Sequence, residues 1–363
     1  MPLPAPLRPL RCNNPDCTLP EEGRCARLSE FPEPLADCVD LARATDATAV
    51  TQETPTAPWS GRALIPAEVE RLLWNAPVRL VAVVGPRSAG KTTLLTSFFL
   101  QLANGQRGAF PYRFASSLTL HSLRDLAKKA DDWSGKPSDN IVDHTVIADE
   151  LRPSSFLHLG LRPEKAEDDR HIDLILTDLP GEWFTAWSGH VNDINQQRLS
   201  FIQRCDAFIL LANAGALMAE GGGIVDTETS LLIRRIADAT QDVTPRPPLA
   251  LVFSQFDRVI QDIEPPAVPA ERTHPRAWAR LGQRSRRTWI AFDQAQHAGL
   301  PCDVFAASAF PQRMSDGQPV GVLEPFIYAM QHADNRQPGA PLEFPIPKDA
   351  RGLTTLRRWR EPT

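Results

Sequence analysis

The chain contains 363 residues, of which 42% are hydrophobic, and it carries a formal net charge of −5. This length is enough for one large α/β domain with an extension or for two small domains, and the acidic balance gives no reason to expect nucleic acid as the main partner. The longest apolar stretch, 208–219, is interrupted by Asn213 and Gly215 and is too short to span a bilayer. Because the first residues also lack the apolar core of a signal peptide, we expect a cytoplasmic protein.

The composition changes along the chain and divides it into four expected regions. A Cys-rich head occupies residues 1–45, and a linker rich in Thr, Ala and Pro follows at 46–62. The main domain extends from 63 to 335, and a Pro-rich, basic tail occupies 336–363.

The head holds four of the six cysteines, Cys12, Cys17, Cys25 and Cys38. In a reducing compartment, four thiols so close together indicate a metal site rather than disulfides, and sets of four thiolates suit Zn²⁺. The spacing is not that of a regular zinc ribbon, so free thiols in a flexible arm are the alternative. We predict a structural zinc module that needs the metal in order to fold.

A strand, a glycine-rich loop and a helix are expected in succession near the start of the main domain. Residues 78–84 form an apolar, β-branched run that suits a buried parallel strand, and residues 92–102 suit a helix. Between them the sequence reads Gly85-Pro86-Arg87-Ser88-Ala89-Gly90-Lys91-Thr92-Thr93. It matches glycine, four residues, glycine, lysine, then serine or threonine, in the context that a phosphate-binding loop requires.

The residue types of this loop suit a nucleoside triphosphate. Gly85 and Gly90 allow the backbone to curl so that its N–H groups point at phosphate oxygens, and the helix N-terminus adds a partial positive charge. Lys91 is expected to reach the β- and γ-phosphates, and the hydroxyl of Thr92 to bind Mg²⁺. An ordinary glycine-rich turn is the alternative.

Helices and strands alternate along the rest of the domain. We expect helices at 66–74, 122–133, 193–205, 225–240, 276–297 and 322–332, and strands at 155–161, 171–178, 207–213, 249–253 and 303–307. This alternation predicts an α/β fold with a doubly wound, mostly parallel sheet and helices on both faces. The strand 155–161 is expected to be an antiparallel edge strand.

The segment Asp178-Leu179-Pro180-Gly181-Glu182 follows one of these strands. A carboxylate such as Asp178 at the carboxyl end of a strand can hold the hydration shell of Mg²⁺. Gly181 can offer its N–H to a γ-phosphate, so the segment after it is expected to respond to the nucleotide. A strand-ending turn without this role is the alternative.

Two further segments complete a series that resembles a known class. Ser254-Gln255-Phe256-Asp257 follows the strand 249–253, and Ser308-Ala309 follows the strand 303–307. In this order, the four segments resemble the P-loop GTPases of the translation-factor-related class. With Arg-Phe-Ala-Ser-Ser-Leu-Thr at 113–119 and Phe-Leu-His-Leu at 156–159, the chain is similar to the bacterial double-GTPase family, second subtype, of biological-conflict systems.

The resemblance covers about residues 63–335 and implies roles at the nucleoside end of the site. Asp257 would accept hydrogen bonds from N1–H and the 2-amino group of guanine, and a backbone N–H of Ser308-Ala309 would contact guanine O6. Ser254 replaces the usual Asn or Thr. Gln255 replaces a lysine whose stem covers the base, which places tight guanine recognition in question.

Two other roles are implied by the same comparison. Glu182 stands where small GTPases carry a glutamine that orients the attacking water, so it would position or deprotonate water; a solvated loop glutamate is the alternative. The switch-one threonine, a second protein ligand of Mg²⁺, would be Thr145, with Thr119 as its rival; for either residue, an ordinary loop threonine is the alternative.

Arginines recur at helical spacing within 276–297, at Arg276, Arg280, Arg284 and Arg287. On one helix they would form a basic stripe. This stripe is either a solvated face or a contact for an acidic partner or a nucleic-acid backbone.

The sequence as a whole predicts a Mg²⁺-dependent GTPase that transfers the γ-phosphoryl group of GTP to water and leaves GDP. Lys91 and Glu182 would be its catalytic side chains. By resemblance, it would work in a defence system with a protein partner, either a second GTPase or an effector. The alternatives are a non-catalytic GTP-gated scaffold and an ATP-using P-loop enzyme.

Overall fold

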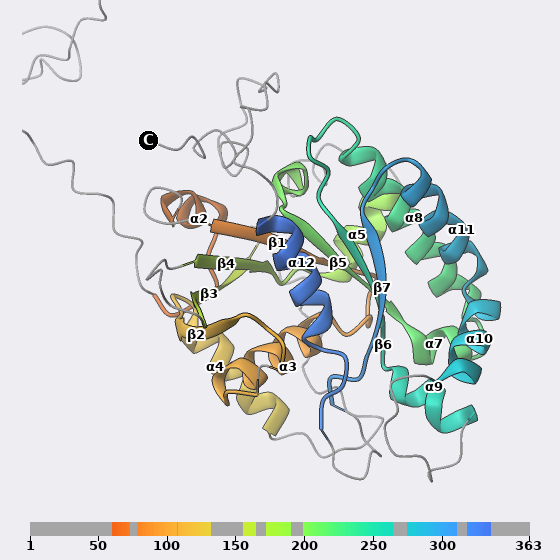
Figure 1. Cartoon of the computed structure of the whole chain (residues 1–363), viewed down its shortest axis with the longest axis horizontal. Helices are drawn as coiled ribbons and strands as arrows, with labels where there is room; N and C mark the ends of the chain where they lie inside the picture. Colours follow the sequence, from red (N-terminus) through yellow and green to blue (C-terminus); the bar gives the residue numbers. More distant parts are fainter. Residues whose placement is uncertain are drawn as a thin grey trace, which may run out of the picture. The chain divides into compact units, whose positions relative to one another are not determined.

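The computed structural model describes residues 60–72, 78–106, 108–131, 155–164, 172–189, 199–263, 274–310 and 318–334 (Figure 1). The Cys-rich head, nearly all of the linker and the basic tail lie outside these ranges, as does Thr145. The expected boundaries of these regions therefore stay predictions.

A seven-stranded sheet with the strand order β2-β3-β4-β1-β5-β6-β7 forms the centre of the fold. The strands are β1 Val78–Val84, β2 Tyr112–Ser116, β3 Phe156–Pro163, β4 Ile172–Thr177, β5 Ala207–Asn213, β6 Leu249–Ser254 and β7 Cys302–Ala307. Strands β4, β1, β5, β6 and β7 pair in parallel, whereas β3 pairs antiparallel with both β2 and β4. The predicted mostly parallel α/β sheet is confirmed.

Helices cover both faces of the sheet (Figure 1). They are α2 Pro66–Leu72, α3 Lys91–Ala103, α4 Leu120–Asp131, α5 Gly181–Gly189, α7 Ala214–Met218, α8 Gly223–Ala239, α9 Phe256–Ile263, α10 Pro275–Arg284, α11 Arg286–His297 and α12 Glu324–Asp334. Side chains of β1 alternate between two cores because successive residues of a strand point to opposite faces. Leu80 and Val84 join the core under α5, α8 and α11, and Val81 and Val83 join the core under α3 and α12.

Two predicted elements differ from the observed ones, and one observed helix was not predicted. The strand β3 is antiparallel as expected, but β2 pairs with its outer side, so β3 is not the edge. Segment 181–189 forms helix α5, because Trp183, Phe184 and Trp187 pack into the core. In the described part of 193–205, the structure has a 3₁₀ turn at Ser200–Arg204 rather than an α-helix.

The predicted helix 276–297 is divided into α10 and α11. The break lies at Ser285, and the buried carboxylate of Asp226 on α8 explains it. This carboxylate accepts the backbone N–H groups of Arg287 at 3.0 Å and Thr288 at 2.8 Å. An acceptor at these free N–H groups caps a new helix N-terminus.

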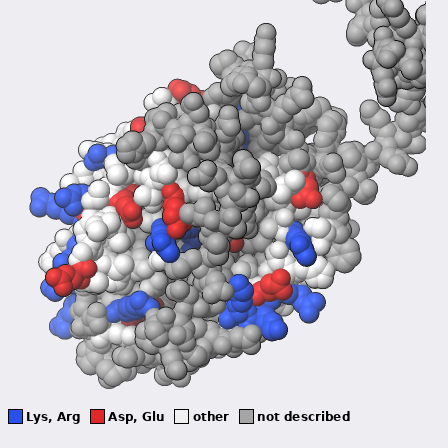
Figure 2. Space-filling view, turned by 180° about the vertical axis from the view of Figure 1, so that it is seen from behind, with Lys and Arg blue, Asp and Glu red and all other residues white. Residues whose placement is uncertain are grey.

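The arginines of this region consequently lie on two helices rather than along one stripe. Arg280 and Arg284 belong to α10, and Arg287 belongs to α11. On the face of the molecule shown in Figure 2, described basic and acidic side chains lie interspersed. No helix within the described ranges is long and apolar enough to cross a membrane.

Candidate functional site

The predicted phosphate-binding loop lies between β1 and α3, at the carboxyl ends of the parallel strands. Gly90 precedes α3 with a φ of +85°, a left-handed conformation that favours glycine. A Cβ atom at Gly85 would lie 2.8 Å from the carbonyl oxygen of Leu211 on β5. Glycines are therefore required at both ends of the loop, one for backbone conformation and one for close packing.

Lys91 is buried beneath the loop that it follows. Its side chain is only 7% exposed, and Nζ donates hydrogen bonds to the carbonyl oxygens of Gly85 at 3.0 Å and Pro86 at 2.9 Å. Burial lowers the pKa of Lys91 to about 8, although the carboxylates of Asp178 and Glu182 raise it. The fold thus buries the Lys91 ammonium where it could bind an anion, although burial makes its charged form less favourable than in water.

This lowered pKa predicts that nucleotide binding takes up a proton in alkaline solution. Below pH 8 the Lys91 ammonium is charged with or without a ligand, whereas between about pH 8 and 10.5 it is largely neutral in the free protein. Bound phosphates would hold it charged, so affinity for a nucleoside triphosphate should fall about tenfold per pH unit above pH 8. Calorimetry in two buffers of different ionisation enthalpy should show more proton uptake at pH 9 than at pH 7. Equal uptake at both pH values would contradict this prediction.

Two of the three predicted Mg²⁺ ligands, Thr92 and Asp178, lie in contact. The hydroxyl of Thr92, in the first turn of α3, donates a 2.8 Å hydrogen bond to Oδ1 of Asp178, which directly follows β4. Mg²⁺ takes oxygen ligands, and it is usually held by one or two carboxylates together with substrate phosphates. A hydroxyl and a carboxylate beside the phosphate-binding loop therefore fit this metal.

Helix α5 begins against the loop. A Cβ atom at Gly181 would lie 2.6 Å from the carbonyl carbon of Pro86, so only glycine allows this approach. Glu182, the next residue, places Oε1 3.4 Å from Nε of Arg87 in the loop. The side chains of Arg87 and Glu182 are 63% and 35% exposed, so the pair lies at the solvent side of the loop.

The nucleoside end of the site is connected to the loop by hydrogen bonds. The hydroxyl of Ser254, the last residue of β6, donates to the carbonyl oxygen of Ala89 at 2.7 Å. The backbone N–H of Asp257 donates to Oγ of Ser308 at 2.9 Å, and the Asp257 side chain is buried. These contacts bring the segments 254–257 and 308–309 to the same edge as the loop.

Gln255 adopts an unusual backbone conformation between these residues. Its φ is +54°, in the left-handed region that residues other than glycine rarely adopt. Its Oε1 atom is buried and has no hydrogen-bond partner within the described ranges. Gln255 was expected from sequence to lie beside the base, and this acceptor is available there.

Asn213, at the end of β5, is a site residue that sequence reasoning missed. Its Nδ2 donates to the carbonyl oxygen of Ser88 at 2.9 Å, and its Oδ1 accepts the N–H of Ala216 at 2.9 Å and so caps α7. The signal in the sequence was a polar residue that ends an otherwise apolar strand.

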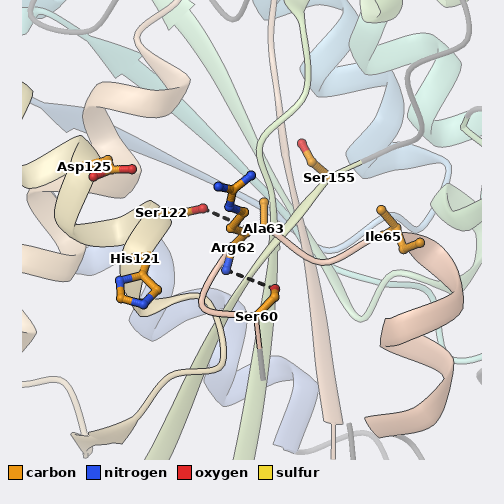
Figure 3. Close-up of a pocket in the computed structure, with 8 residues that line it drawn as sticks. All are labelled: Ser60, Arg62, Ala63, Ile65, His121, Ser122, Asp125 and Ser155. Carbon is orange, nitrogen blue, oxygen red and sulfur yellow. Dashed lines mark hydrogen bonds between the residues drawn. The ribbon is translucent and has the colours of Figure 1, made fainter. Parts of the chain in front are cut away.

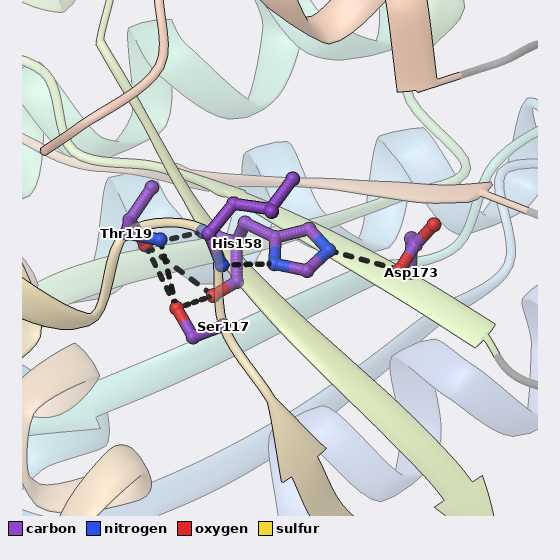
Figure 4. A network of polar contacts seen from close by, with 5 residues as sticks. Ser117, Thr119, His158 and Asp173 are labelled. Carbon is purple, nitrogen blue, oxygen red and sulfur yellow. Dashed lines mark hydrogen bonds and ion pairs between the residues drawn. The ribbon is translucent and has the colours of Figure 1, made fainter. Parts of the chain in front are cut away.

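Thr119, the rival for the switch-one position, belongs to a buried network instead (Figure 4). It is fully buried, and its Oγ1 accepts the backbone N–H of His158 at 2.9 Å. His158 Nδ1 accepts the N–H of Leu118 at 3.0 Å, so Nε2 carries the proton and donates it to Asp173 Oδ1 at 2.9 Å. The hydroxyl of Thr119 therefore joins the start of α4 to β3.

A hollow of about 750 Å³ lies near the start of α4 (Figure 3). Arg62, His121 and Asp125 line it, together with Ser155, whose hydroxyl donates to the backbone carbonyl of Asp178 at 2.9 Å. The lining contains no residue of the loop 85–90.

The predicted zinc ligands Cys12, Cys17, Cys25 and Cys38 lie outside the described residues. Among the residues that the structure does describe, no group of three or more His, Cys, Asp or Glu side chains could hold a metal ion. The zinc module stays a prediction.

A family model decides the assignment that these contacts suggest. The model of the Double-GTPase 2 family matches residues 79–298, which is more than half of the 363 residues. The chain belongs to the Double-GTPase 2 family. This confirms the resemblance stated from the sequence, and the matched range contains the loop, Asp178, Glu182 and Asp257.

Comparison with individual proteins gives weaker evidence than the family model. No curated protein matches the chain. Among solved structures, it is similar to the signal recognition particle receptor SRb-GTP/SRX complex from Chaetomium thermophilum. That similarity has 20% identity and a TM-score of 0.33, and it covers 64% of this chain and 90% of that chain. Membership of a GTPase family supports GTP as the nucleotide and Mg²⁺ as its metal.

Proposed function

We propose that this protein binds GTP together with Mg²⁺ and hydrolyses it to GDP as a nucleotide-gated switch. The observation that carries the proposal is the 2.8 Å hydrogen bond between Thr92 and Asp178. It joins residues 86 positions apart, and it lies beside the buried Lys91, whose ammonium donates hydrogen bonds to the loop carbonyl oxygens of Gly85 and Pro86. This is the arrangement that a magnesium-bound triphosphate needs.

The reaction would be displacement of the γ-phosphoryl group by water. Lys91 would leave the carbonyl oxygens of Gly85 and Pro86 and contact the β- and γ-phosphates, where it stabilises the developing negative charge. Thr92 and Asp178 would hold Mg²⁺, which supplies further charge neutralisation when it is bound. Glu182 would orient the attacking water or accept its proton.

Selection of guanine would depend on Asp257. The carboxylate would accept hydrogen bonds from N1–H and the 2-amino group, neither of which adenine offers. Ser254 and Ser308 hold the two segments in place through the bonds to Ala89 and to the N–H of Asp257. The Ser308-Ala309 segment would offer a backbone N–H to guanine O6.

Asp257→Ala is expected to remove the preference for GTP over ATP. Each lost hydrogen bond to a charged acceptor is worth about 1.5–3 kcal/mol, so the two together correspond to a loss of about 100-fold or more in GTP affinity. ATP affinity should change little. Competition titrations against a fluorescent nucleotide would measure both.

Asp257→Asn provides a matched variant of the same size. Its amide can donate to an oxo group, so it should favour xanthosine triphosphate, which carries an oxo group where guanine has its 2-amino group. Equal binding of GTP and ATP by the unaltered protein would contradict guanine selection.

A GTP-gated scaffold without turnover of its own is a second candidate, and one contact favours it. Glu182 is paired with Arg87 rather than free to hold water. In this alternative the protein would bind GTP and present a changed surface to a partner. The partner would be a second GTPase or an effector in a cytoplasmic defence system.

We also propose a zinc module formed by Cys12, Cys17, Cys25 and Cys38, which the sequence places within one short segment. Protein purified without added metal should contain about one zinc per chain, because four thiolates complete a tetrahedral site. Elemental analysis would measure it. Zinc that persists after removal of residues 1–45 would assign the metal to another part of the chain.

A further inference from the structure

Arg87 is a loop residue to which the proposed reaction gives no task. It lies within the phosphate-binding loop, and its side chain is 63% exposed. In the described part of the protein, the ion pair that it forms is with Glu182, at 3.4 Å. A long cationic side chain is therefore held at the mouth of the proposed phosphate site by the residue proposed to act on water.

We propose that Arg87 is an internal arginine for phosphoryl transfer: when GTP binds, its guanidinium leaves Glu182 and contacts the γ-phosphate. The inference rests on the proposed function and deepens it. Arginines supplied to this position by a partner, or by the same chain, stabilise charge in the transition state of related reactions. Here the chain would supply its own.

The relative strength of the two interactions supports the exchange. An ion pair that is this exposed is weak, because water and salt screen it. A γ-phosphate carries more charge than a carboxylate, and its oxygens match the forked donors of a guanidinium. The triphosphate should therefore displace Glu182 from Arg87, whereas GDP, which lacks the γ-phosphate, should leave the pair in place.

The exchange would also release Glu182 for its own task. Gly181, the residue before it, packs directly on the loop backbone at Pro86 and Arg87. Arg87, Glu182 and the start of α5 would thus respond together to the γ-phosphate.

The test compares the affinities for GTPγS and GDP, and the rate of single-turnover GTP hydrolysis, in three variants. Arg87→Ala should weaken GTPγS about tenfold relative to GDP and slow hydrolysis at least about 100-fold, because a phosphate contact and transition-state charge are lost. Arg87→Lys should recover much of the affinity ratio but little of the rate, since an ammonium lacks the fork. Arg280→Ala, at an exposed position on α10, is the control and should behave as the unaltered protein.

An unchanged GTPγS-to-GDP ratio in Arg87→Ala, or faster hydrolysis, would overturn the inference and leave the proposed function standing. If the unaltered protein hydrolyses GTP too slowly to measure, the ratio of GTPγS to GDP affinity in Arg87→Ala still tests the inference. Failure of the unaltered protein to bind GTP would instead overturn the proposed function.

Discussion

Lys91→Ala is expected to lower the affinity for GTP by at least about 100-fold while leaving the protein folded. The ammonium is already positioned under the loop, 2.9–3.0 Å from two carbonyl oxygens that it would exchange for phosphates. Two charge-assisted hydrogen bonds of about 1.5 kcal/mol each account for this minimum loss. Titration with a fluorescent GTP analogue would measure it.

The free protein should not lose stability through loss of this charge. Burial lowers the pKa of Lys91 to about 8, which shows that its charged form is held at a solvation cost. Lys91→Met keeps most of the side-chain volume and is the better variant for thermal unfolding; its midpoint should lie within a few degrees of that of the unaltered protein. Lys128→Ala, at an exposed position on α4, is the control for binding. Undiminished GTP binding by both Lys91 variants would remove the phosphate site from this loop.

The sequence was sufficient to predict the centre of the fold because its signals are local. Strand β1 is a continuous apolar run, and the glycines and lysine after it have fixed spacing, so strand, loop and α3 follow directly. The contact between Thr92 and Asp178 could be anticipated for a related reason. Asp178 directly follows β4, and Thr92 lies in the first turn of α3, after the loop that follows β1; because β1 and β4 are neighbouring parallel strands, their carboxyl ends meet at one edge.

Elements that depend on distant contacts could not be predicted in the same way. The division between α10 and α11 requires the Asp226 carboxylate, which comes from α8. Strand β2 is short and half-exposed, and among the described strands it pairs with β3 alone, so its sequence shows little of the apolar run that marks the central strands. Helix α5 had a signal in Trp183 and Trp187, one turn apart on a buried face, but the preceding turn residues obscured it.

The side-chain contacts at the site also could not be predicted from the sequence, because they join distant residues. Arg87 and Glu182 are 95 positions apart, and only the packing of Gly181 on the loop brings them together. Asn213 contacts Ser88 because β5 adjoins β1, which strand order decides and a linear pattern does not. Motifs thus predicted which residues would serve a nucleotide, whereas the fold was needed to show which side chains contact those residues.

Glu182→Ala is expected to slow single-turnover GTP hydrolysis by about 10²–10⁴-fold, the usual loss when a group that positions or deprotonates water is removed. Affinity for GTP should change little, because the proposed contact of Glu182 is with water rather than nucleotide. Its carboxylate is one-third exposed and paired only weakly with Arg87, so it can turn toward the site without a large penalty. Exposed Glu220 is the matched control, and Glu220→Ala should hydrolyse GTP at the unaltered rate.

Glu182→Gln separates the two ways in which this carboxylate could act. An amide oxygen still accepts a hydrogen bond from water but is a far weaker base, so a near-normal rate indicates orientation and a rate like that of Glu182→Ala indicates proton transfer. Turnover within a few-fold of normal in both variants would show that Glu182 has no part in the reaction. Hydrolysis too slow to measure in the unaltered protein would instead favour the scaffold. The assay would then be repeated with the product of a genetically adjacent gene, because a partner can supply a missing cation in trans.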